Sequence, residues 1–277
     1  MLPNTASHPI GVFDSGFGGL TILKEIVKRL PQYDFMFLGD NARTPYGNRS
    51  FEAVYEYTKQ SVFWLFNQGC PLVILACNTA SAKALRSIQQ KDLPALAPNR
   101  KVLGVIRPVT EQIGTYTRTR HVGIFATVGT VRSQSYTIEI NKMFPDIVVT
   151  MEACPLWVPL VENNETDSAG TEYFVKKHIE TLLSKDPKID TIILGCTHYP
   201  LLIPVIKKFL LPGITLINQG TIEAHSLADY LQRHPNIDAA CTKQSQQTFY
   251  TTDCCENFDR LAEQFYGMST CSQKITL

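Results

Sequence analysis

The sequence lacks several features that would assign it to a special class of protein. Its 277 residues carry a net charge of only +1, so no excess of basic residues indicates binding to nucleic acid. No apolar run approaches the roughly 20 residues that cross a membrane. The first residues, Met1 to His8, have neither the basic nor the apolar segment of a signal peptide. We therefore expect a soluble, cytoplasmic protein that binds neither nucleic acid nor membranes.

Cysteine is not scarce, but the arrangements that would give it a structural role are absent. No Cys-x-x-Cys pair occurs among the eight cysteines, which disfavours a zinc ribbon or a thioredoxin-like site. A disulfide framework is not expected in a chain of this length without an export signal. Adjacent Cys254 and Cys255 are interpreted as incidental thiols near a loop. Buried small apolar side chains are the interpretation for Cys70, Cys154, Cys241 and Cys271.

The two remaining cysteines stand in stretches that resemble each other. Leu72–Ala76 and Thr191–Gly195 are apolar runs rich in β-branched residues, as in strands that are buried on both faces. Cys77 and Cys196 end these runs, and the polar residues that follow predict a turn into a helix. Each thiol should lie where parallel sheets bind ligands and where helix amides favour a thiolate. Two thiols in matching settings suggest one acid and one base.

The rest of the pattern alternates between strands and helices, which is typical of the α/β class. A glycine-rich loop, Asp14–Gly19, joins the first strand to the first helix without the spacing of a nucleotide fingerprint. The expected strands are 10–13, 34–38, 101–106 and 248–252. The expected helices are 20–30, 51–67, 81–90, 108–116, 201–210, 221–232 and 256–266.

The pattern of the first half then starts again. Val122-Gly-Ile-Phe125 is similar to Ile10-Gly-Val-Phe13, at an offset of 112 residues (122 against 10). The run from Asp146 to Glu152 is similar to the run from Asp34 to Asp40, at the same offset (152 against 40). Similar features in the same order indicate an internal duplication.

The duplication has a chemical consequence. The cysteines are offset by 119 residues (196 against 77), and an insertion in the polar segment 162–170 accounts for the difference. The repeat thus equates Cys77 with Cys196 and Asp40 with Glu152. Two copies facing each other would place one thiol and one carboxylate on each side of a central ligand.

We therefore expect an α/β fold of two pseudo-symmetric domains, each a mostly parallel sheet flanked by helices, with the active site in the cleft between them. The first domain is expected to be discontinuous, because the tail fits neither copy and should return to complete it. The expected boundaries are 1–104 plus 217–277 for the first domain and 105–216 for the second.

Four motifs in this order make the chain resemble the glutamate racemases. They are Asp14-Ser-Gly-x-Gly-Gly-Leu-Thr, Asp40-x-Ala-Arg-x-Pro-Tyr-Gly47, Ala76-Cys-Asn-Thr-Ala-Ser81 and Gly195-Cys-Thr-His-Tyr-Pro-Leu-Leu202. The tail Phe249-Tyr-Thr-Thr-Asp253 with Phe258 also fits. Histidine in the last motif favours glutamate over aspartate as the substrate. Two positions depart from the family: Ile217–Gly220, where many members carry an aspartate-serine pair, and Arg107.

The resemblance implies an enzyme that needs no cofactor and no metal, and that supplies D-glutamate for peptidoglycan. Its expected partners are the substrate and a second copy of the chain in a homodimer. The resemblance also assigns Cys196 to proton transfer with L-glutamate and Cys77 to proton transfer with D-glutamate. The catalytic residues that it implies are Cys77, Cys196, Asp14, Asp40, Glu152 and His198. The substrate-binding residues are Asp14, Ser15, Pro45, Tyr46, Gly47, Asn78, Thr79, Thr127, Thr197 and His198.

Racemisation needs two opposed acid–base groups, because one group can hardly reach both faces of Cα.

Two other classes of protein stay open at this point. A cysteine hydrolase would use Cys196 with His198 and leave Cys77 unexplained. A non-catalytic amino-acid-binding protein would keep the pocket without needing both thiols. Loss of the optical signal of L-glutamate without a new product would support only the racemase.

Overall fold

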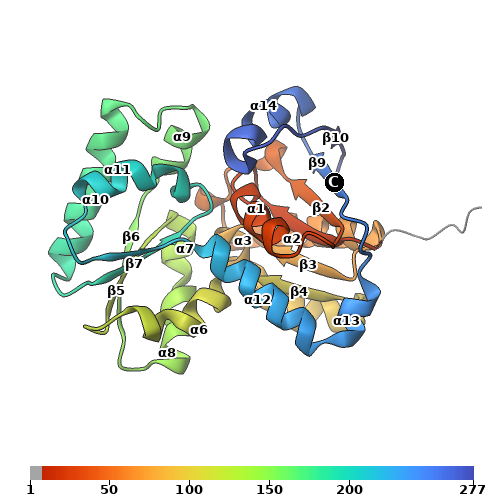
Figure 1. The fold of residues 1–277 in the computed structure, drawn as a ribbon, viewed down its shortest axis with the longest axis horizontal. Helices are drawn as coiled ribbons and strands as arrows, with labels where there is room; N and C mark the ends of the chain where they lie inside the picture. Colours follow the sequence, from red (N-terminus) through yellow and green to blue (C-terminus); the bar gives the residue numbers. More distant parts are fainter. Residues whose placement is uncertain (1–7) are drawn as a thin grey trace, which may run out of the picture.

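Two lobes, each built on a parallel sheet flanked by helices, make up the part of the chain that the computed structural model describes, residues 8–277 (Figure 1). The first sheet has the strand order β10-β9-β2-β1-β3-β4 and the second the order β6-β5-β7-β8. The first consists of β1 (Ile10–Asp14), β2 (Phe35–Gly39), β3 (Leu72–Leu75), β4 (Lys101–Gly104), β9 (Gln247–Thr251) and β10 (Ser272–Lys274). The second consists of β5 (His121–Ala126), β6 (Val148–Ala153), β7 (Thr191–Gly195) and β8 (Thr215–Ile217). The predicted fold class is confirmed.

The strands are parallel because a helix connects nearly every successive pair. The helices of the first lobe are α1 (Leu20–Arg29), α2 (Phe51–Asn67), α3 (Asn78–Lys83), α4 (Leu85–Ser87), α5 (Leu93–Leu96), α12 (Gln219–Arg233), α13 (Pro235–Ala240) and α14 (Cys255–Tyr266). Those of the second lobe are α6 (Ile106–Tyr116), α7 (Val128–Ser133), α8 (Ser135–Met143), α9 (Trp157–Glu162), α10 (Ala169–Lys185) and α11 (Ile203–Phe209). Shorter helical turns are η1 (Asn41–Arg43), η2 (Tyr46–Asn48), η3 (Ile88–Asp92) and η4 (Tyr199–Leu202). No helix in this described part of the chain is both long and apolar enough to cross a membrane.

The helix after the first cysteine begins earlier than predicted. It starts at Asn78 rather than at residue 81, because Cys77 itself is the N-cap and its sulfur accepts a hydrogen bond from the backbone N–H of Ala80. It is also broken, since α3 ends at Lys83 and the chain continues through α4 and a π-helical turn, η3. A single helix over residues 81–90 was therefore wrong.

The two sheets repeat the same topology, as the duplication predicts. Strands β2-β1-β3-β4 in the first lobe match β6-β5-β7-β8 in the second, each with the second strand outside the first. Gly11 on β1 lies opposite Val73 on β3, just as Gly123 on β5 lies opposite Ile192 on β7. Four residues beyond each of these partners stand the two cysteines, so Cys77 and Cys196 are structurally equivalent.

The strand register also shows that the predicted equivalence of Asp40 with Glu152 is wrong. Ile10 lies opposite Phe35 in the first lobe, and Val122 lies opposite Val149 in the second. Asp40, five residues beyond Phe35, therefore corresponds to Cys154 and not to Glu152. The equal sequence offset was misleading, because the second strand of the second lobe is displaced by two residues in sequence.

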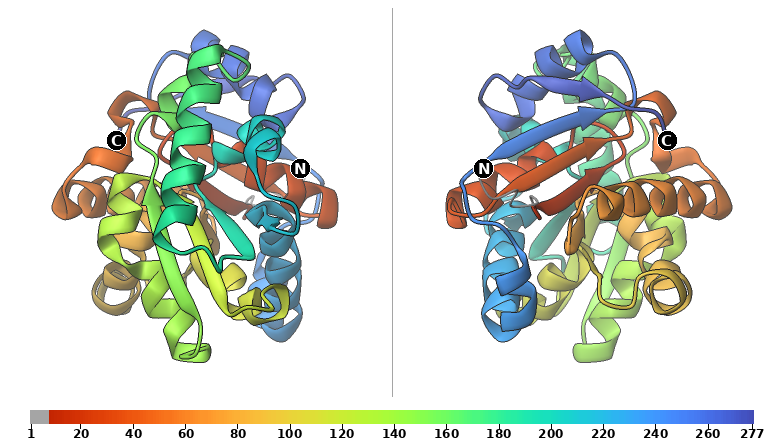
Figure 2. Two further views of the ribbon diagram at one scale, coloured as in Figure 1. Left: turned by 90° about the vertical axis from the view of Figure 1, so that its left-hand side faces the viewer. Right: turned by 90° about the vertical axis from the view of Figure 1, so that its right-hand side faces the viewer.

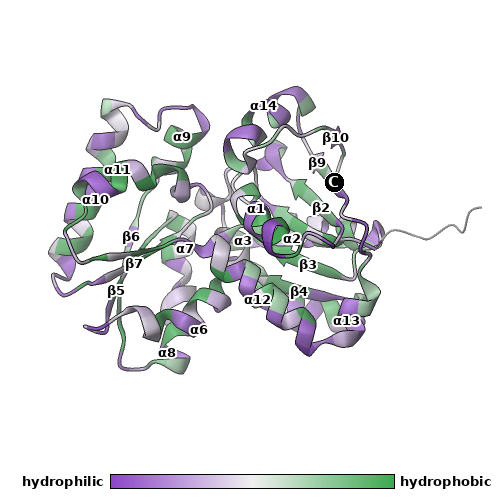
Figure 3. Cartoon of the chain, in the orientation of Figure 1, coloured by the Kyte–Doolittle hydropathy of each residue, from purple (hydrophilic) through white to green (hydrophobic). Residues whose placement is uncertain are grey.

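The tail of the chain returns to the first lobe. Strand β9 pairs with β2 in parallel register and β10 pairs with β9, so both extend the first sheet. The end-on views show this tail lying along the outer strands of that sheet (Figure 2). Strands β1 and β3 of the first sheet and β7 of the second run through the apolar interior of their lobes (Figure 3). The domain boundaries at residues 104 and 216 stay a prediction, with β4 ending at Gly104 and β8 at Ile217.

Candidate active site

The two equivalent cysteines line one narrow cavity. Cys77 follows β3 and Cys196 follows β7, and each is 6% exposed. The cavity has a volume of about 60 Å³. Its lining includes these residues expected from the sequence: Ser15, Pro45, Tyr46, Gly47, Cys77, Asn78, Thr79, Thr127, Cys196, Thr197 and His198. It also includes residues that sequence analysis did not assign: Thr44, Asn48, Val128, Cys154, Pro155, Val158 and Pro159.

The surroundings of Cys77 favour a neutral thiol. Burial, followed by the nearby carboxylate of Asp14, raises the pKa of Cys77 to about 12. Hydrogen bonds act in the opposite direction: Sγ lies 3.4 Å from the hydroxyl of Ser15 and 3.5 Å from the backbone nitrogen of Ala80. The helix amide therefore lowers the pKa of Cys77, as expected, but burial raises this pKa by more.

The surroundings of Cys196 differ, because a histidine lies beside it. Cys196 Sγ is 4.0 Å from His198 Nδ1, and His198 Nε2 is 2.9 Å from Glu162 Oε1. Burial alone would lower the pKa of His198, but its interactions with Cys196 and Glu162 raise it to about 10. The imidazole is therefore protonated at neutral pH.

Sequence analysis missed Glu162, which it assigned only to a polar insertion. This residue ends α9, in the segment that leads away from the carboxyl end of β6. The corresponding segment of the first lobe begins at Asp40 and was recognised because it carries a motif. The signal available in the second half was that the segment containing Glu162 follows the second strand of a repeat, as the segment after Asp40 does in the first half.

Asp14 lies beside the cavity rather than in its lining. It is 1% exposed, and its Oδ2 accepts a hydrogen bond of 2.9 Å from the backbone N–H of Gly16. Burial raises the pKa of Asp14 to about 6, although the positive charge of His198 opposes the shift. Its Oδ1 is buried and has no hydrogen-bond partner within residues 8–277. A buried acceptor in this state would bind a cation or a donor readily.

Asp40 also lies outside the lining, and its carboxylate is occupied. Oδ2 accepts hydrogen bonds from Tyr46 (2.5 Å) and from Arg43 Nε (2.6 Å), and Oδ1 accepts one from Thr252 (2.9 Å). Of these partners, Tyr46 lines the cavity. Through these contacts, Asp40 fixes the position of the loop that carries Tyr46.

Glu152 does not line the cavity, so its predicted position beside a central ligand was wrong. Its Oε1 is 2.7 Å from His178 Nδ1 and its Oε2 is 2.6 Å from Lys185 Nζ, both on α10. The cause is the pleat of the strand. Glu152 lies in register with Phe125, and adjacent residues in register point to the same face of a sheet. That face packs against α10.

Close contacts join the lobes around the cavity. A Cβ atom on Gly18 would lie 2.2 Å from Thr197 Oγ1 and 2.5 Å from His198 Nδ1, so only glycine allows this approach. The hydroxyl of Thr21 donates to the carbonyl of Thr197 at 3.0 Å. Across the cavity, the hydroxyls of Thr79 and Thr127 are 2.9 Å apart.

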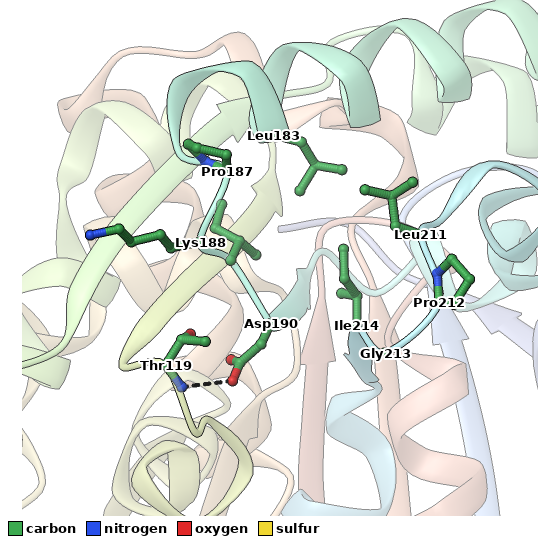
Figure 4. Close-up of a pocket in the computed structure, with 10 residues that line it drawn as sticks. Thr119, Leu183, Pro187, Lys188, Asp190, Leu211, Pro212, Gly213 and Ile214 are labelled. Carbon is green, nitrogen blue, oxygen red and sulfur yellow. Dashed lines mark hydrogen bonds between the residues drawn. The ribbon is translucent and has the colours of Figure 1, made fainter.

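A larger cavity, of about 520 Å³, lies at the opposite edge of the second sheet, near the amino ends of β7 and β8 (Figure 4). The carboxylate in its lining, half-buried Asp190, accepts hydrogen bonds from Thr117 Oγ1, Arg118 N and Thr119 N. Burial alone would raise the pKa of Asp190, but these bonds hold it at about 2. Because this carboxylate is occupied and parallel sheets bind ligands at their carboxyl ends, we place the chemistry at the cysteines.

Fold and site together define an α/β enzyme that performs acid–base chemistry on a small molecule between two lobes. The chain belongs to the Asp/Glu/Hydantoin racemase family, whose model matches residues 11–227. It is 38% identical to the glutamate racemase of Geobacter metallireducens over 259 residues, 93% of this chain and 92% of the relative. It is 40% identical to that of Ruegeria pomeroyi over 238 residues, 82% of this chain and 87% of the relative.

Solved structures agree with these matches. The glutamate racemase isoform RacE1 from Bacillus anthracis has a TM-score of 0.88 at 34% identity, with 98% of each chain covered. That of Francisella tularensis, in complex with D-glutamate, has a TM-score of 0.86 at 32% identity, again with 98% of each chain covered. The predicted family and enzyme class, glutamate racemase, are confirmed by these comparisons.

Proposed function

We propose that this chain interconverts L-glutamate and D-glutamate without a cofactor, by passing a proton at Cα between Cys196 and Cys77. The observation that supports this most directly is the pairing of two equivalent, buried thiols in one cavity. Racemisation requires opposed groups, one to remove a proton and one to return it. Equivalent positions in two facing repeats provide that opposition.

The unlike surroundings of the thiols assign their starting states. The protonated imidazole of His198 lies beside Cys196, with its Nδ1 4.0 Å from the Cys196 Sγ. No cation of residues 8–277 contributes to the pKa of Cys77, which burial raises to about 12, so Cys77 starts as a thiol. The proposed reaction from L-glutamate therefore starts with Cys196 as the base and Cys77 as the acid.

In the forward direction, the Cα–H bond of L-glutamate breaks and its proton forms an S–H bond on Cys196. The electron pair stays on Cα, and the S–H bond of Cys77 then breaks as its proton forms a new Cα–H bond on the opposite face. The enzyme is left with a thiol at Cys196 and a thiolate at Cys77. This is the form that reacts with D-glutamate, and the return of a proton from Cys196 to Cys77 resets the site.

The substrate must be held so that its carbanion-like state is stabilised in a dry cavity. The unpartnered oxygen of Asp14 is suited to the substrate ammonium. The ammonium would in turn favour the thiolate of Cys77 when that group acts as base. The predicted ligands of the carboxylates are the hydroxyl and amide groups of Ser15, Asn78, Thr79, Thr127 and Thr197, all of which line the cavity.

A cysteine hydrolase has one observation in its favour. Cys196 contacts His198, and His198 contacts Glu162, in the arrangement of a nucleophile, a base and an orienting carboxylate. That function leaves Cys77 in the same cavity without a role. The family to which the chain belongs also favours the racemase.

The experiment that tests the proposal follows L-glutamate by circular dichroism in deuterium oxide. A racemase reduces the ellipticity to zero with no new product, and deuterium enters Cα of the enantiomer formed. A hydrolase gives a new product, and a binding protein leaves the ellipticity unchanged. The buried thiol Cys70, which lies outside the cavity, provides a matched control as Cys70→Ser.

The predicted biological role is the supply of D-glutamate for peptidoglycan in the cytoplasm, by a homodimer. Membership of the racemase family supports the product. Depletion of the protein in its own cells should be rescued by D-glutamate in the medium. Sedimentation at several protein concentrations tests the homodimer.

A further inference from the structure

A closed ring of three hydrogen bonds lies next to Cys77. Tyr136 donates its hydroxyl to Asn78 Oδ1 at 2.6 Å, Asn78 Nδ2 donates to Gln219 Oε1 at 2.9 Å, and Gln219 Nε2 donates to the hydroxyl of Tyr136 at 2.7 Å. All three side chains are at most 3% exposed. Asn78 and Gln219 are the first residues of α3 and α12 in one lobe, and Tyr136 comes from α8 in the other (Figure 1).

The direction of every bond in the ring follows from one backbone group. Gln219 Nε2 also lies 3.2 Å from the carbonyl oxygen of Val105, which can only accept a hydrogen bond. The amide nitrogen of Gln219 must face that carbonyl, so its oxygen faces Asn78. Asn78 must then present its nitrogen to Gln219 and its oxygen to Tyr136. Burial raises the pKa of Tyr136, so its hydroxyl keeps the proton that it donates.

The ring leaves one group of Asn78 unused. Its amide nitrogen carries two N–H groups, and the ring uses one of them. Asn78 lines the cavity directly after Cys77, so the second N–H is available to a ligand there. A flipped amide would present an oxygen instead and would repel an anionic ligand.

We propose that Gln219 and Tyr136 are positioning residues that hold the amide of Asn78 with an N–H toward a carboxylate oxygen of glutamate. This inference rests on the proposed function. It gives a role to Gln219, in the segment Ile217–Gly220 that sequence analysis singled out, because only a side chain with both a donor and an acceptor can join Val105 to Asn78. It also makes the orientation of Asn78 depend on the contact between lobes, since Tyr136 reaches it from the second lobe.

The test is a double-mutant cycle through Asn78. Tyr136→Phe and Gln219→Met keep the volume of each side chain and remove its hydrogen bonds. Each should lower kcat/KM for L-glutamate about tenfold, mainly by raising KM, as expected for loss of one hydrogen bond to a charged group. In the background of Asn78→Ala, either change should cost less than about twofold more, because the group that it orients is gone.

Tyr266→Phe is the matched control, because Tyr266 is also buried and donates to the side-chain amide of Gln247 outside the cavity. It should reduce kcat/KM by less than about twofold, while its melting temperature should change by about as much as that of Tyr136→Phe. The inference is overturned if Tyr136→Phe and Gln219→Met leave KM unchanged, or if they cost the same with and without Asn78.

A second measurement separates this inference from the proposed function. If the wild-type protein fails to racemise glutamate, the proposed function is refuted, and the side-chain amide resonances of Asn78 still report on the ring. Their hydrogen exchange should be slow in the wild type and at least about tenfold faster in Tyr136→Phe, as expected once a buried hydrogen bond is lost. Equal exchange in the two proteins would refute the positioning role.

Discussion

Glu223 makes the stability of this protein depend on pH in an unusual direction. It lies on α12, is 2% exposed, and its Oε2 has no hydrogen-bond partner within the described residues. Burial raises its pKa from 4.5 to about 8. The carboxyl is therefore neutral in the folded protein at pH 7 and ionised in the unfolded chain. The charge of Glu223 also contributes to raising the pKa of the Tyr136 phenol.

The sign and size of the effect follow from proton linkage. Between pH 4.5 and 8 the folded state holds a proton that the unfolded state has released, so the free energy of unfolding falls as pH rises. Each pH unit contributes about 1.4 kcal/mol, so the whole interval contributes about 3 to 5 kcal/mol. Above the folded pKa both states are ionised and the effect is constant.

Glu223→Gln removes this titration while keeping the shape of the side chain. We expect the variant to be close to the wild type in stability at pH 5, where both side chains are neutral in the folded state. At pH 8.5 it should be more stable by about 3 to 5 kcal/mol. Urea unfolding between pH 5 and 9 measures the difference. Glu263→Gln, at an exposed position of α14, controls for the loss of a negative charge.

A pH-independent difference between Glu223→Gln and the wild type would refute this reasoning. So would a variant that is less stable at every pH, because the buried carboxyl would then have a partner that the amide cannot satisfy.

Four further predictions concern the reaction. Cys77→Ser and Cys196→Ser should each abolish measurable racemisation, because a serine hydroxyl is a far weaker base at neutral pH; near-normal turnover in either would exclude the two-base mechanism. Glu162→Gln removes a charge that raises the pKa of His198, so it should lower kcat by about 10²-fold or less and shift the basic limb of the pH profile to lower pH. Glu152→Gln, away from the cavity, should retain most activity, and the opposite ranking of the two glutamates would return Glu152 to the site. Exhaustive dialysis with a chelator should leave activity intact, and loss that is restored by an added metal or cofactor would contradict the cofactor-independent reaction.

Much of the fold could be predicted, because strands β1, β2, β3 and β7 are buried throughout and read as continuous apolar runs. The strands ending at Cys77 and Cys196 and the helix Phe51–Asn67 lie where periodicity places them. The repeat was also visible, since each half begins with the same short strand. What the sequence could not supply was register within the second half. A displacement of two residues on β6 moved Glu152 from the cavity to the face that packs against α10.

The candidate site was predictable where a motif marks a loop at the end of a strand. Glu162 was not, because it reaches His198 from the end of a helix 36 residues earlier in the chain. The protonation states could not be predicted either. Cys77 precedes a helix, which favours a thiolate, yet burial next to Asp14 raises its pKa, and burial depends on how the lobes close.

The matching strand order of the two lobes relates Cys77 to Cys196 by a rotation, and a rotation cannot exchange mirror-image molecules. In the proposed reaction the flat intermediate presents two faces, which the rotation exchanges, and three unlike substituents, which it does not. Groups that act on the faces can therefore remain alike after duplication, as the thiols have. Groups that bind the substituents must diverge. The first lobe, for example, carries Asp40 at the position where the second lobe carries Cys154. Duplication of an ancestral half would thus supply the acid and base together, and the discrimination of carboxylate, ammonium and side chain would arise afterwards by loss of symmetry.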